Sequence, residues 1–537
     1  MALLLATTIA LGPTAIPAFA ASKPAATQTA EDAAATATPI KHLVVIFNEN
    51  ISFDHYFGTY PNAENRTGEP QFHAFPGTPT VNGLSNTLLT NNPNLNPANG
   101  TGATNPFRLD RSQAVTNDMD HDYTPEQQAA DAGLMDLFPV NTGAPGPPPS
   151  GSGASQTNGL VMGYFDGNTV TALWNYAQFF AMSDNNYGTT FGPSTVGVMN
   201  LVAGQTNGAV ATLNGTGDEV NGGPDGSLTV IGDPDPIGDV CSSPSRNQVT
   251  MGGTTIGDLL SAARVSWGGF MGGFNLNIVN PNGTTGCSRS SAGLAGTTAD
   301  YIPHHSLFAY WPSVANPKHT RPAGLFEIGH DGNAHHQYDI EDFYAAAASG
   351  HLPAVSFLKA PAFQDAHPGY SDPLDEQNFV VKTVNLLQSL PSWASTAVVV
   401  MYDDSDGWYD HQMGPIVNTS TGPADALTGP GTCGTAALSL PGISPTANPH
   451  ALGRCGYGPR QPMIVMSPWA RRNFVDNTVI SQTSVIHFIE DNWLGGQRIG
   501  GGSFDAITNS ISQMFNFTHL RTDGVLFLNP ATGERVP

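Results

Sequence analysis

The sequence predicts an α/β fold, a layered sandwich around a central, mostly parallel sheet. Two observations predict it. Short apolar runs typical of buried strands recur along the chain, and segments with apolar residues at helical spacing separate them from residue 340 onward. Strands that alternate with helices form parallel sheets whose faces the helices cover. With 537 residues, the chain fits one large domain with insertions or two domains.

The predicted strands are short and rich in Val, Ile, Leu and Met, which suits burial on both faces of a sheet. They cover 41–47, 354–358, 398–402 and 463–466. The predicted helices cover 169–180, 340–348, 376–390 and 481–494. Gly350 is a plausible stop for the second of these helices. In the third, Val380, Val384 and Leu387 share one face. In the last, the shared face carries Val485, Phe488, Ile489 and Trp493.

The remaining segments predict the domain organisation. Residues 1–20 have an apolar core and an Ala18-Phe19-Ala20 cleavage-like site, which predicts a signal peptide, although a basic start is missing. An Ala-rich disordered leader is the rival interpretation, and residues 21–39 are predicted to be such a leader. Residues 40–537 form the predicted catalytic domain, with loop-rich insertions at about 60–160 and 205–300. No later apolar run reaches the ~18 residues of a membrane span, so we expect a secreted or periplasmic protein without stable membrane insertion.

The net charge limits the classes of binding partner, and the cysteine content indicates the cellular compartment. The formal net charge is −24, which disfavours nucleic acid and anionic lipid, because both require basic surface. The four cysteines suit an oxidising compartment. Of the three possible connectivities, loop-like sequence between neighbours favours Cys241–Cys287 and Cys433–Cys455. A zinc site of four thiolates is the rival, but no C-x-x-C spacing supports it.

Polar side chains follow two of the predicted strands. Asp403 and Asp404 come directly after the strand 398–402, and Glu49 and Asn50 follow the first strand. Crowded carboxylates repel one another unless a cation or a proton compensates, and the carboxyl ends of buried strands are where α/β sheets build their sites. We therefore predict a metal site. A solvated strand end is the alternative for Glu49 and Asn50.

A third segment predicts an anion site. Gly192-Pro193 makes a turn, and an apolar stretch follows, so Ser194 and Thr195 are expected at a helix N-terminus. Such a hydroxyl becomes a nucleophile if a metal lowers its pKa, whereas a plain N-cap is the alternative. Four histidines are candidates for holding phosphoryl oxygens or for moving protons, although each alone is more often structural. They are His121, His304, His305 and His367.

Together these segments resemble a known family, the bacterial acid phosphatase and phospholipase C group of phosphoesterases within the alkaline phosphatase superfamily. The resemblance runs from about residue 41 to residue 494. The motifs that carry it lie at 48–58, 191–195, 367–377 and 403–411. It implies an alkaline-phosphatase-like sheet and hydrolysis of phosphoric esters. The implied substrates are small phosphate esters or phospholipid headgroups.

The resemblance also implies roles for individual residues. Glu49, Asn50, Asp403 and Asp404 match metal ligands, and the hydroxyl residue of the Gly-Pro-Ser-Thr motif matches a nucleophile that is itself a ligand. Of the two hydroxyls, we prefer Thr195 to Ser194, because it lies nearer the apolar helix. The four histidines match residues that surround the phosphoryl group. At mildly acidic pH they are partly cationic, since an unperturbed histidine titrates near ~6.5.

An all-oxygen ligand set favours one Ca, Mg or Mn ion, with Zn as an option. Asp406, Asp410 and His411 are expected to shape the loop, and a second metal held by them is the open alternative. An acid phosphatase is the first prediction, since the longer phospholipases of this group carry extra C-terminal β-domains and this chain ends at Pro537, shortly after the last predicted helix. Phospholipase C is the rival prediction. A non-catalytic secreted calcium-binding module is the alternative of another class.

Overall fold

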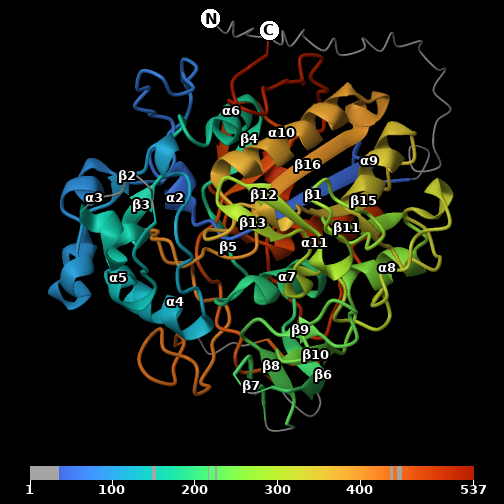
Figure 1. Ribbon diagram of the computed structural model, residues 1–537, viewed down its shortest axis with the longest axis horizontal. Helices are drawn as coiled ribbons and strands as arrows, with labels where there is room; N and C mark the ends of the chain where they lie inside the picture. Colours follow the sequence, from blue (N-terminus) through green and yellow to red (C-terminus); the bar gives the residue numbers. More distant parts are fainter. Residues whose placement is uncertain are drawn as a thin grey trace, which may run out of the picture.

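A central sheet organises the structure (Figure 1). The computed structural model describes residues 35–147, 153–215, 217–223, 226–435, 440–443 and 450–536. Within them lies an eight-stranded sheet with the order β14-β11-β15-β1-β16-β17-β4-β18. Pairing is parallel from β14 to β16, whereas β17 runs antiparallel to both of its neighbours. The strands are β14 (Gln337–Asp339), β11 (Trp267–Met271), β15 (Val355–Lys359), β1 (His42–Asn48), β16 (Thr396–Tyr402), β17 (Met463–Met466), β4 (Ala181–Ser183) and β18 (Phe474–Asp476).

Helices lie on both sides of this sheet. In Figure 1, α10 runs along one side of β1 and β16, and α7 and α8 lie on the other side. Each strand residue of β1 and β16 is buried, which explains their continuous apolar runs. The helices are α2 (Phe53–Phe57), α3 (Asn86–Thr90), α4 (Tyr123–Ala130), α5 (Phe138–Asn141), α6 (Thr171–Phe179), α7 (Ser194–Ala203), α8 (Ile256–Ala262), α9 (Ile340–Ala348), α10 (Pro373–Ser389) and α11 (Thr483–Trp493).

The predicted α/β class with a mostly parallel central sheet is confirmed, and the alkaline-phosphatase-like layering stays a prediction. The predicted strands and helices all form, with ends that shift by a few residues. The apolar face predicted for α10 is buried, and so is that of α11 except for Trp493, which is partly buried. None of the helices in the described part is both long and apolar enough to cross a membrane.

The segment 205–300, predicted as an insertion with short strands, has two parts. Its first part forms a peripheral five-stranded sheet of β6 (Asn207–Leu213), β7 (Glu219–Asn221), β8 (Leu228–Val230), β9 (Asp235–Pro236) and β10 (Gln248–Met251). Its second part contains β11, which belongs to the central sheet. The Trp-Gly-Gly-Phe-Met sequence of β11 lacks an apolar run, because its glycines allow neighbouring aromatic rings to pack against the strand.

The smaller elements of the loop-rich segments are two-stranded pairs. These are β2 (Phe107–Arg108) with β3 (Gly163–Tyr164), β5 (Asn186–Tyr187) with β19 (Ile480–Ser481), and β12 (Ser290–Gly293) with β13 (Gly296–Ala299). Both predicted disulfides, Cys241–Cys287 and Cys433–Cys455, are present. Residues 1–34, which include the predicted signal peptide, lie outside the described residues. The last residues of the predicted leader, 35–39, are held in place where the Thr38 amide donates to Asn492 Oδ1 at 2.9 Å.

Three neighbouring parallel strands position the polar side chains of the site. β15, β1 and β16 lie side by side, with Ile46 opposite Leu358 and Asn48 opposite Tyr402. Because parallel strands end at the same edge, the residues that follow them meet there. These residues are Lys359 at the end of β15, Glu49 and Asn50 after β1, and Asp403 and Asp404 after β16.

Candidate active site

The hydroxyl of Ser194 lies at the centre of the oxygen-rich cluster. Ser194 is the first residue of α7, after the N-cap Pro193, so the positive end of the helix dipole faces the site. Its Oγ lies 2.9 Å from Glu49 Oε2, 3.1 Å from Asp404 Oδ2 and 3.4 Å from Asn50 Oδ1. All four residues are buried. A single hydroxyl proton therefore faces three acceptor oxygens.

Asn50 holds its place through an unusual backbone conformation. Its φ is 56°, in the left-handed region that asparagine tolerates better than most residues. This turn lets the Asn50 amide donate to Asp403 Oδ1 at 3.1 Å while the side-chain carbonyl faces Ser194. The hydrogen bond connects the segment after the carboxyl end of β1 to the segment after the carboxyl end of β16.

The two adjacent aspartates have different surroundings. Asp404 faces Ser194, whereas Asp403 does not. Asp403 Oδ1 accepts the amides of Asn50 and Asp404, and its Oδ2 lies 2.8 Å from Lys359 Nζ. Lys359 also forms an ion pair with Glu49 Oε1. Asp403 thus lies behind the Ser194 cluster, next to a buried ammonium group.

The electrostatics of the cluster favour a cation. Burial, followed by repulsion from Asp403, raises the pKa of Glu49 well above its ordinary value. Burial also raises the pKa of Asp404, although His121 opposes the shift. Ligand oxygens of Glu49, Asp403 and Asp404 all lie within 4.8 Å of one another. Buried carboxylates that converge in this way, with an amide and a hydroxyl oxygen, fit a divalent ion that prefers oxygen ligands.

The structure brings all four predicted histidines to one side of this cluster. His305 Nδ1 lies 3.0 Å from Glu49 Oε1, and its ring is 4.5 Å from that of His304. His367 stacks on His305 with ring centroids 6.3 Å apart. His121 Nε2 lies 3.3 Å from the Asn50 side-chain nitrogen. The four rings come from three segments of the chain and lie next to one another, beside Glu49 and Asn50.

The histidines differ in charge. Burial, with His304 adding to it, holds the pKa of His305 well below its usual range. Burial lowers the pKa of His367 to about 4. Burial also opposes the charged form of His121, but the carboxylates of Asp404 and Asp406 outweigh it and raise the pKa of that imidazole. The surroundings therefore favour the neutral form of His305 and His367 and the cationic form of His121.

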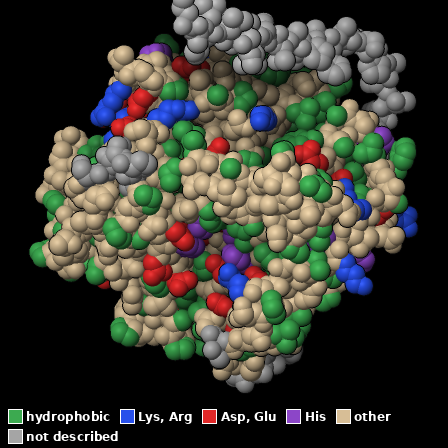
Figure 2. All heavy atoms as spheres, in the orientation of Figure 1, with side chains coloured by type: hydrophobic (Ala, Val, Ile, Leu, Met, Phe, Trp, Pro, Cys, Tyr) green, Lys and Arg blue, Asp and Glu red, His purple; other side chains and the backbone are tan. Residues whose placement is uncertain are grey.

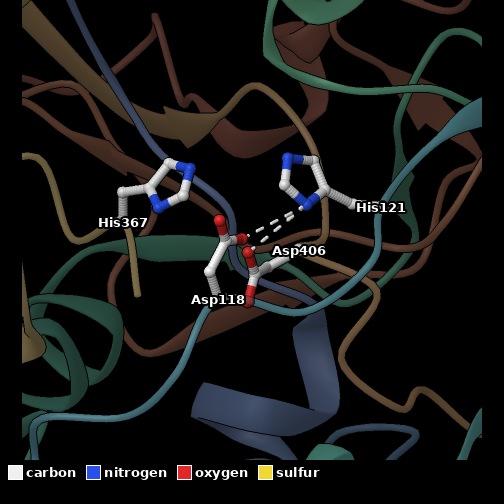
Figure 3. Close-up of side chains that lie close together, drawn as sticks. All are labelled: Asp118, His121, His367 and Asp406. Carbon is white, nitrogen blue, oxygen red and sulfur yellow. Dashed lines mark ion pairs between the residues drawn. The ribbon is translucent and has the colours of Figure 1, made fainter. Parts of the chain in front are cut away.

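His121 and His367 flank two further carboxylates (Figure 3). Asp118 and Asp406 lie between the rings, and His121 Nδ1 is 3.7 Å from Asp118 and 3.5 Å from Asp406. The side chain of Asp118 is 52% exposed, whereas that of Asp406 is buried. On the face of the molecule drawn in Figure 2, histidine and acidic side chains gather around a hollow near the middle. The cluster around His121 marks the open side of the site.

Thr195, the preferred nucleophile of the sequence analysis, has its hydroxyl directed elsewhere. Its Oγ1 donates to the carbonyl of His304 at 3.1 Å, and its amide donates to Asp233 Oδ1 at 2.8 Å. It therefore connects α7 to the loop that carries the histidine pair. Thr195 and Ser194 point in different directions because consecutive residues are rotated by about 100° around a helix axis.

Asp410 and His411, which with Asp406 are the alternative ligands of a second metal, lie beside a buried arginine, and together with Asp54 they form a group that could hold a metal ion. Both carboxylate oxygens of Asp410 lie 3.1 Å from Arg460 Nε. His411 Nδ1 lies 2.6 Å from Asp54 Oδ2, and Arg460 also pairs with Asp54. The guanidinium supplies the positive charge that these groups require.

Two residues of the site were missed by the sequence analysis. Lys359 had a usable signal, because it directly follows a predicted strand whose neighbours in the sheet also end in polar groups. Glu126 had none, since it reads as an ordinary acid in the first turn of a helix. Its carboxylate accepts the Ser405 hydroxyl at 2.6 Å and the Gly192 amide at 3.0 Å. Glu126 thereby connects the turn before α7 to the loop that follows β16.

Gly197 permits the close approach of α7 to β16, and it provides a test of this packing. A Cβ at this position would lie 2.3 Å from the Asp403 carbonyl oxygen. We expect Gly197→Ala to lower the free energy of unfolding by about 1–3 kcal/mol, through overpacking, and to lower activity by displacing Ser194 from Asp404. Denaturant unfolding and steady-state assays measure both effects.

Gly324→Ala is the matched control, because a Cβ there meets nothing within 4 Å. Unchanged stability in Gly197→Ala would contradict the close helix–strand contact.

Comparisons with known proteins identify the family of the chain. The model of the phosphoesterase family matches residues 40–494. A non-hemolytic phospholipase C of Pseudomonas aeruginosa is 31% identical over 176 residues, covering 31% of this chain and 24% of that protein. A non-hemolytic phospholipase C of Burkholderia pseudomallei is 24% identical over 90% of this chain and 60% of its own length. Phospholipase C A of Mycobacterium tuberculosis is 24% identical over 89% of this chain and 78% of its own length.

The chain thus spans less than two thirds of the first two relatives. The family match covers most of the chain and includes the segments that carry Glu49, Ser194, the four histidines and the two aspartates. The chain belongs to the phosphoesterase family.

Proposed function

We propose that the protein is a metal-dependent hydrolase of phosphoric esters that works through a phosphoserine at Ser194. One observation carries the proposal. The Ser194 hydroxyl lies at a helix N-terminus, within 3.4 Å of oxygens from Glu49, Asn50 and Asp404. A nucleophile, an anion-binding helix end and a cation-binding oxygen set then share one point in space. Ser194 takes the role first expected for Thr195.

We propose that Glu49, Asn50, Asp404 and Ser194 hold one divalent ion, with Asp403 behind them. The all-oxygen set favours Ca, Mg or Mn over Zn. When bound, such an ion lowers the pKa of a hydroxyl and screens the charge of a phosphoryl group.

Different residues of the chain carry out the proton transfers and the attack on phosphorus. Glu49 and Asp404 accept the hydrogen bond of the Ser194 hydroxyl and are the nearest acceptors for its proton. Ser194 Oγ then bonds to phosphorus as the bond to the leaving oxygen breaks. His121, which lies beside the half-exposed Asp118, donates a proton to that leaving oxygen. Positioning and charge stabilisation supply most of the rate enhancement.

His367 suits the second step, hydrolysis of the phosphoserine. Its Nδ1 bonds to the Pro368 carbonyl at 2.6 Å, which leaves Nε2 as an acceptor. Because burial lowers its pKa to about 4, the ring is neutral at neutral pH and can take a proton from the attacking water. As the water oxygen bonds to phosphorus, the bond from phosphorus to Ser194 Oγ breaks, and Oγ regains the proton that Glu49 or Asp404 accepted. His304 and His305 are proposed to contact the phosphoryl oxygens.

Phosphate monoesters, as cleaved by acid phosphatases, are the first candidate substrates. Phospholipid diesters are the second candidate, favoured by the names of the relatives that match most of the chain. The two candidates share the same first step and differ in the leaving group and in the charge of the phosphoryl oxygens.

A substrate panel separates these candidates and tests the activity itself. We expect the purified protein, supplied with Mn or Ca, to hydrolyse p-nitrophenyl phosphate, and phosphate release measures the rate. Phosphatidylcholine in mixed micelles is the comparison, with diacylglycerol as the measured product. Strong diester turnover with negligible monoester turnover would replace the first candidate by the second. No turnover of either ester would favour the calcium-binding module instead.

We also propose that the protein works outside the reducing cytoplasm. Both cysteine pairs of the chain form disulfides, and such bonds persist in oxidising compartments. Fractionation of expressing cells, with detection of the mature chain in the periplasm or the medium, tests this proposal.

A further inference from the structure

A buried lysine lies among the proposed metal ligands. Lys359 is the last residue of β15, and its side chain is 1% exposed. Its ammonium group pairs with Glu49 Oε1 and lies 2.8 Å from Asp403 Oδ2. The group also lies 4.9 Å from the centre of the Phe47 ring, on the neighbouring strand. A lysine is rarely buried to this degree unless it is paired, and here two carboxylates pair with it.

Glu49 connects two cation positions. Its Oε2 faces Ser194 at 2.9 Å, while its Oε1 faces Lys359 and His305. Asp403 faces only the second position, because its Oδ1 is occupied by two backbone amides. A carboxylate with its two oxygens directed at two positively charged positions is the arrangement that bridges two metal ions in dinuclear sites. Here an ammonium group holds one of those positions.

We infer that the Lys359 ammonium occupies the place of a second cation, so that the site takes a single divalent ion at Ser194. This inference rests on the proposed function only for the ion at Ser194. The charges agree with it. Glu49, Asp403 and Asp404 carry three negative charges when ionised, and one ammonium with one divalent ion neutralises them. The neighbouring Asp365 has its own donors, the His367 amide and the Tyr370 hydroxyl. Lys359 is a positioning residue, since it acts through Glu49 and Asp403 and does not face Ser194.

Removing the ammonium group should open a second cation position. In Lys359→Ala, Glu49 Oε1 and Asp403 Oδ2 face an unfilled space and still require positive charge. We expect the metal content to rise from about one to about two divalent ions per chain. A merely structural lysine would not change the number of bound ions.

The test is metal analysis of the full-length protein after chelation and reloading with Mn, with gel filtration to remove free ion. Lys382→Ala is the matched control, because this lysine lies exposed on α10. It should retain the metal content and the activity of the unmodified chain. Ethylammonium chloride added to Lys359→Ala should restore activity in a saturable manner, since the amine can replace the lost group.

The outcomes separate the two proposals. One ion in both the unmodified chain and Lys359→Ala, with similar activity, would overturn the role of Lys359 and leave the hydrolase intact. Two ions in the unmodified chain would also overturn it, with the cluster of Asp118, His121, His367 and Asp406 as the place of the second ion. Absence of any bound ion would overturn both proposals. If Lys359→Ala folds poorly, recovery of folding by Mn or by ethylammonium supports the inference, and failure with both overturns it.

Discussion

Replacing Ser194 with alanine is expected to lower kcat on phosphate esters by on the order of 10⁴-fold or more, as for other enzymes that lose their nucleophile. The physical reason is the position of its hydroxyl, which lies within 3.4 Å of Glu49, Asn50 and Asp404. The measurement is single-turnover hydrolysis, with a trap for phosphorylated protein by acid quench and peptide mass analysis. The unmodified chain should show the phosphoryl group on the peptide that contains Ser194.

Thr195→Val is the matched control for this prediction, because it removes a neighbouring hydroxyl of the same helix turn while keeping the volume. That hydroxyl donates to the His304 carbonyl, so we expect a modest loss, about 10-fold, through a shifted histidine loop. If Thr195→Val abolishes turnover and Ser194→Ala does not, Thr195 is the nucleophile and the assignment from geometry is wrong. If both variants retain full activity, the covalent mechanism is wrong.

Removal of the metal is expected to abolish hydrolysis, and Asp404→Asn is expected to mimic it. Asp404 contacts Ser194 at 3.1 Å and is the aspartate of the pair that faces the nucleophile. Its neutral replacement keeps the shape but loses a charge, so we expect affinity for the ion to fall by at least about 100-fold. Titration of the chelated protein with Ca, Mg, Mn and Zn, followed by assay and by thermal unfolding, measures the effect and ranks the metals.

Asp331→Asn serves as the control for a lost carboxylate, since the Asp331 side chain is 88% exposed. It should bind metal as the unmodified chain does. Full activity of the chelated protein, verified as metal-free, would contradict the proposed chemistry. Full activity of Asp404→Asn at low metal concentration would move the site away from this aspartate.

Much of the fold follows from local pattern. The strands β1, β15, β16 and β17 read as apolar runs because both of their faces are covered. The strand β11 could not be read in the same way, since its glycines contribute space for aromatic neighbours and no apolar pattern of their own. Its membership of the central sheet depends on pairing with β14 and β15, which are distant in the chain.

The sequence likewise indicated some features of the candidate site and not others. Polar residues directly after buried strands, and a Gly-Pro turn before an apolar helix, pointed to Glu49, Asn50, Asp403, Asp404 and the Ser194-Thr195 pair. Local sequence could not distinguish Ser194 from Thr195, because the choice depends on the rotation of α7 about its axis relative to β16. Nor could it show that Asp403 and Asp404 differ, because the difference comes from Lys359 on another strand.

Residue types and their order along the chain were therefore sufficient for the class of fold, the family resemblance and the residues that gather at the site. The sequence did not give the direction in which each side chain points. Three choices depend on contacts between different segments: which hydroxyl faces Asp404, which aspartate pairs with Lys359 and which acid pairs with Arg460. The contacting residues lie 210, 44 and 50 positions apart in the sequence. The acid cluster at 403–411 contains four buried aspartates with four different partners, because burial requires each charge to be paired. Asp404 faces the Ser194 hydroxyl, Asp403 faces Lys359, Asp406 faces His121 and Asp410 faces Arg460.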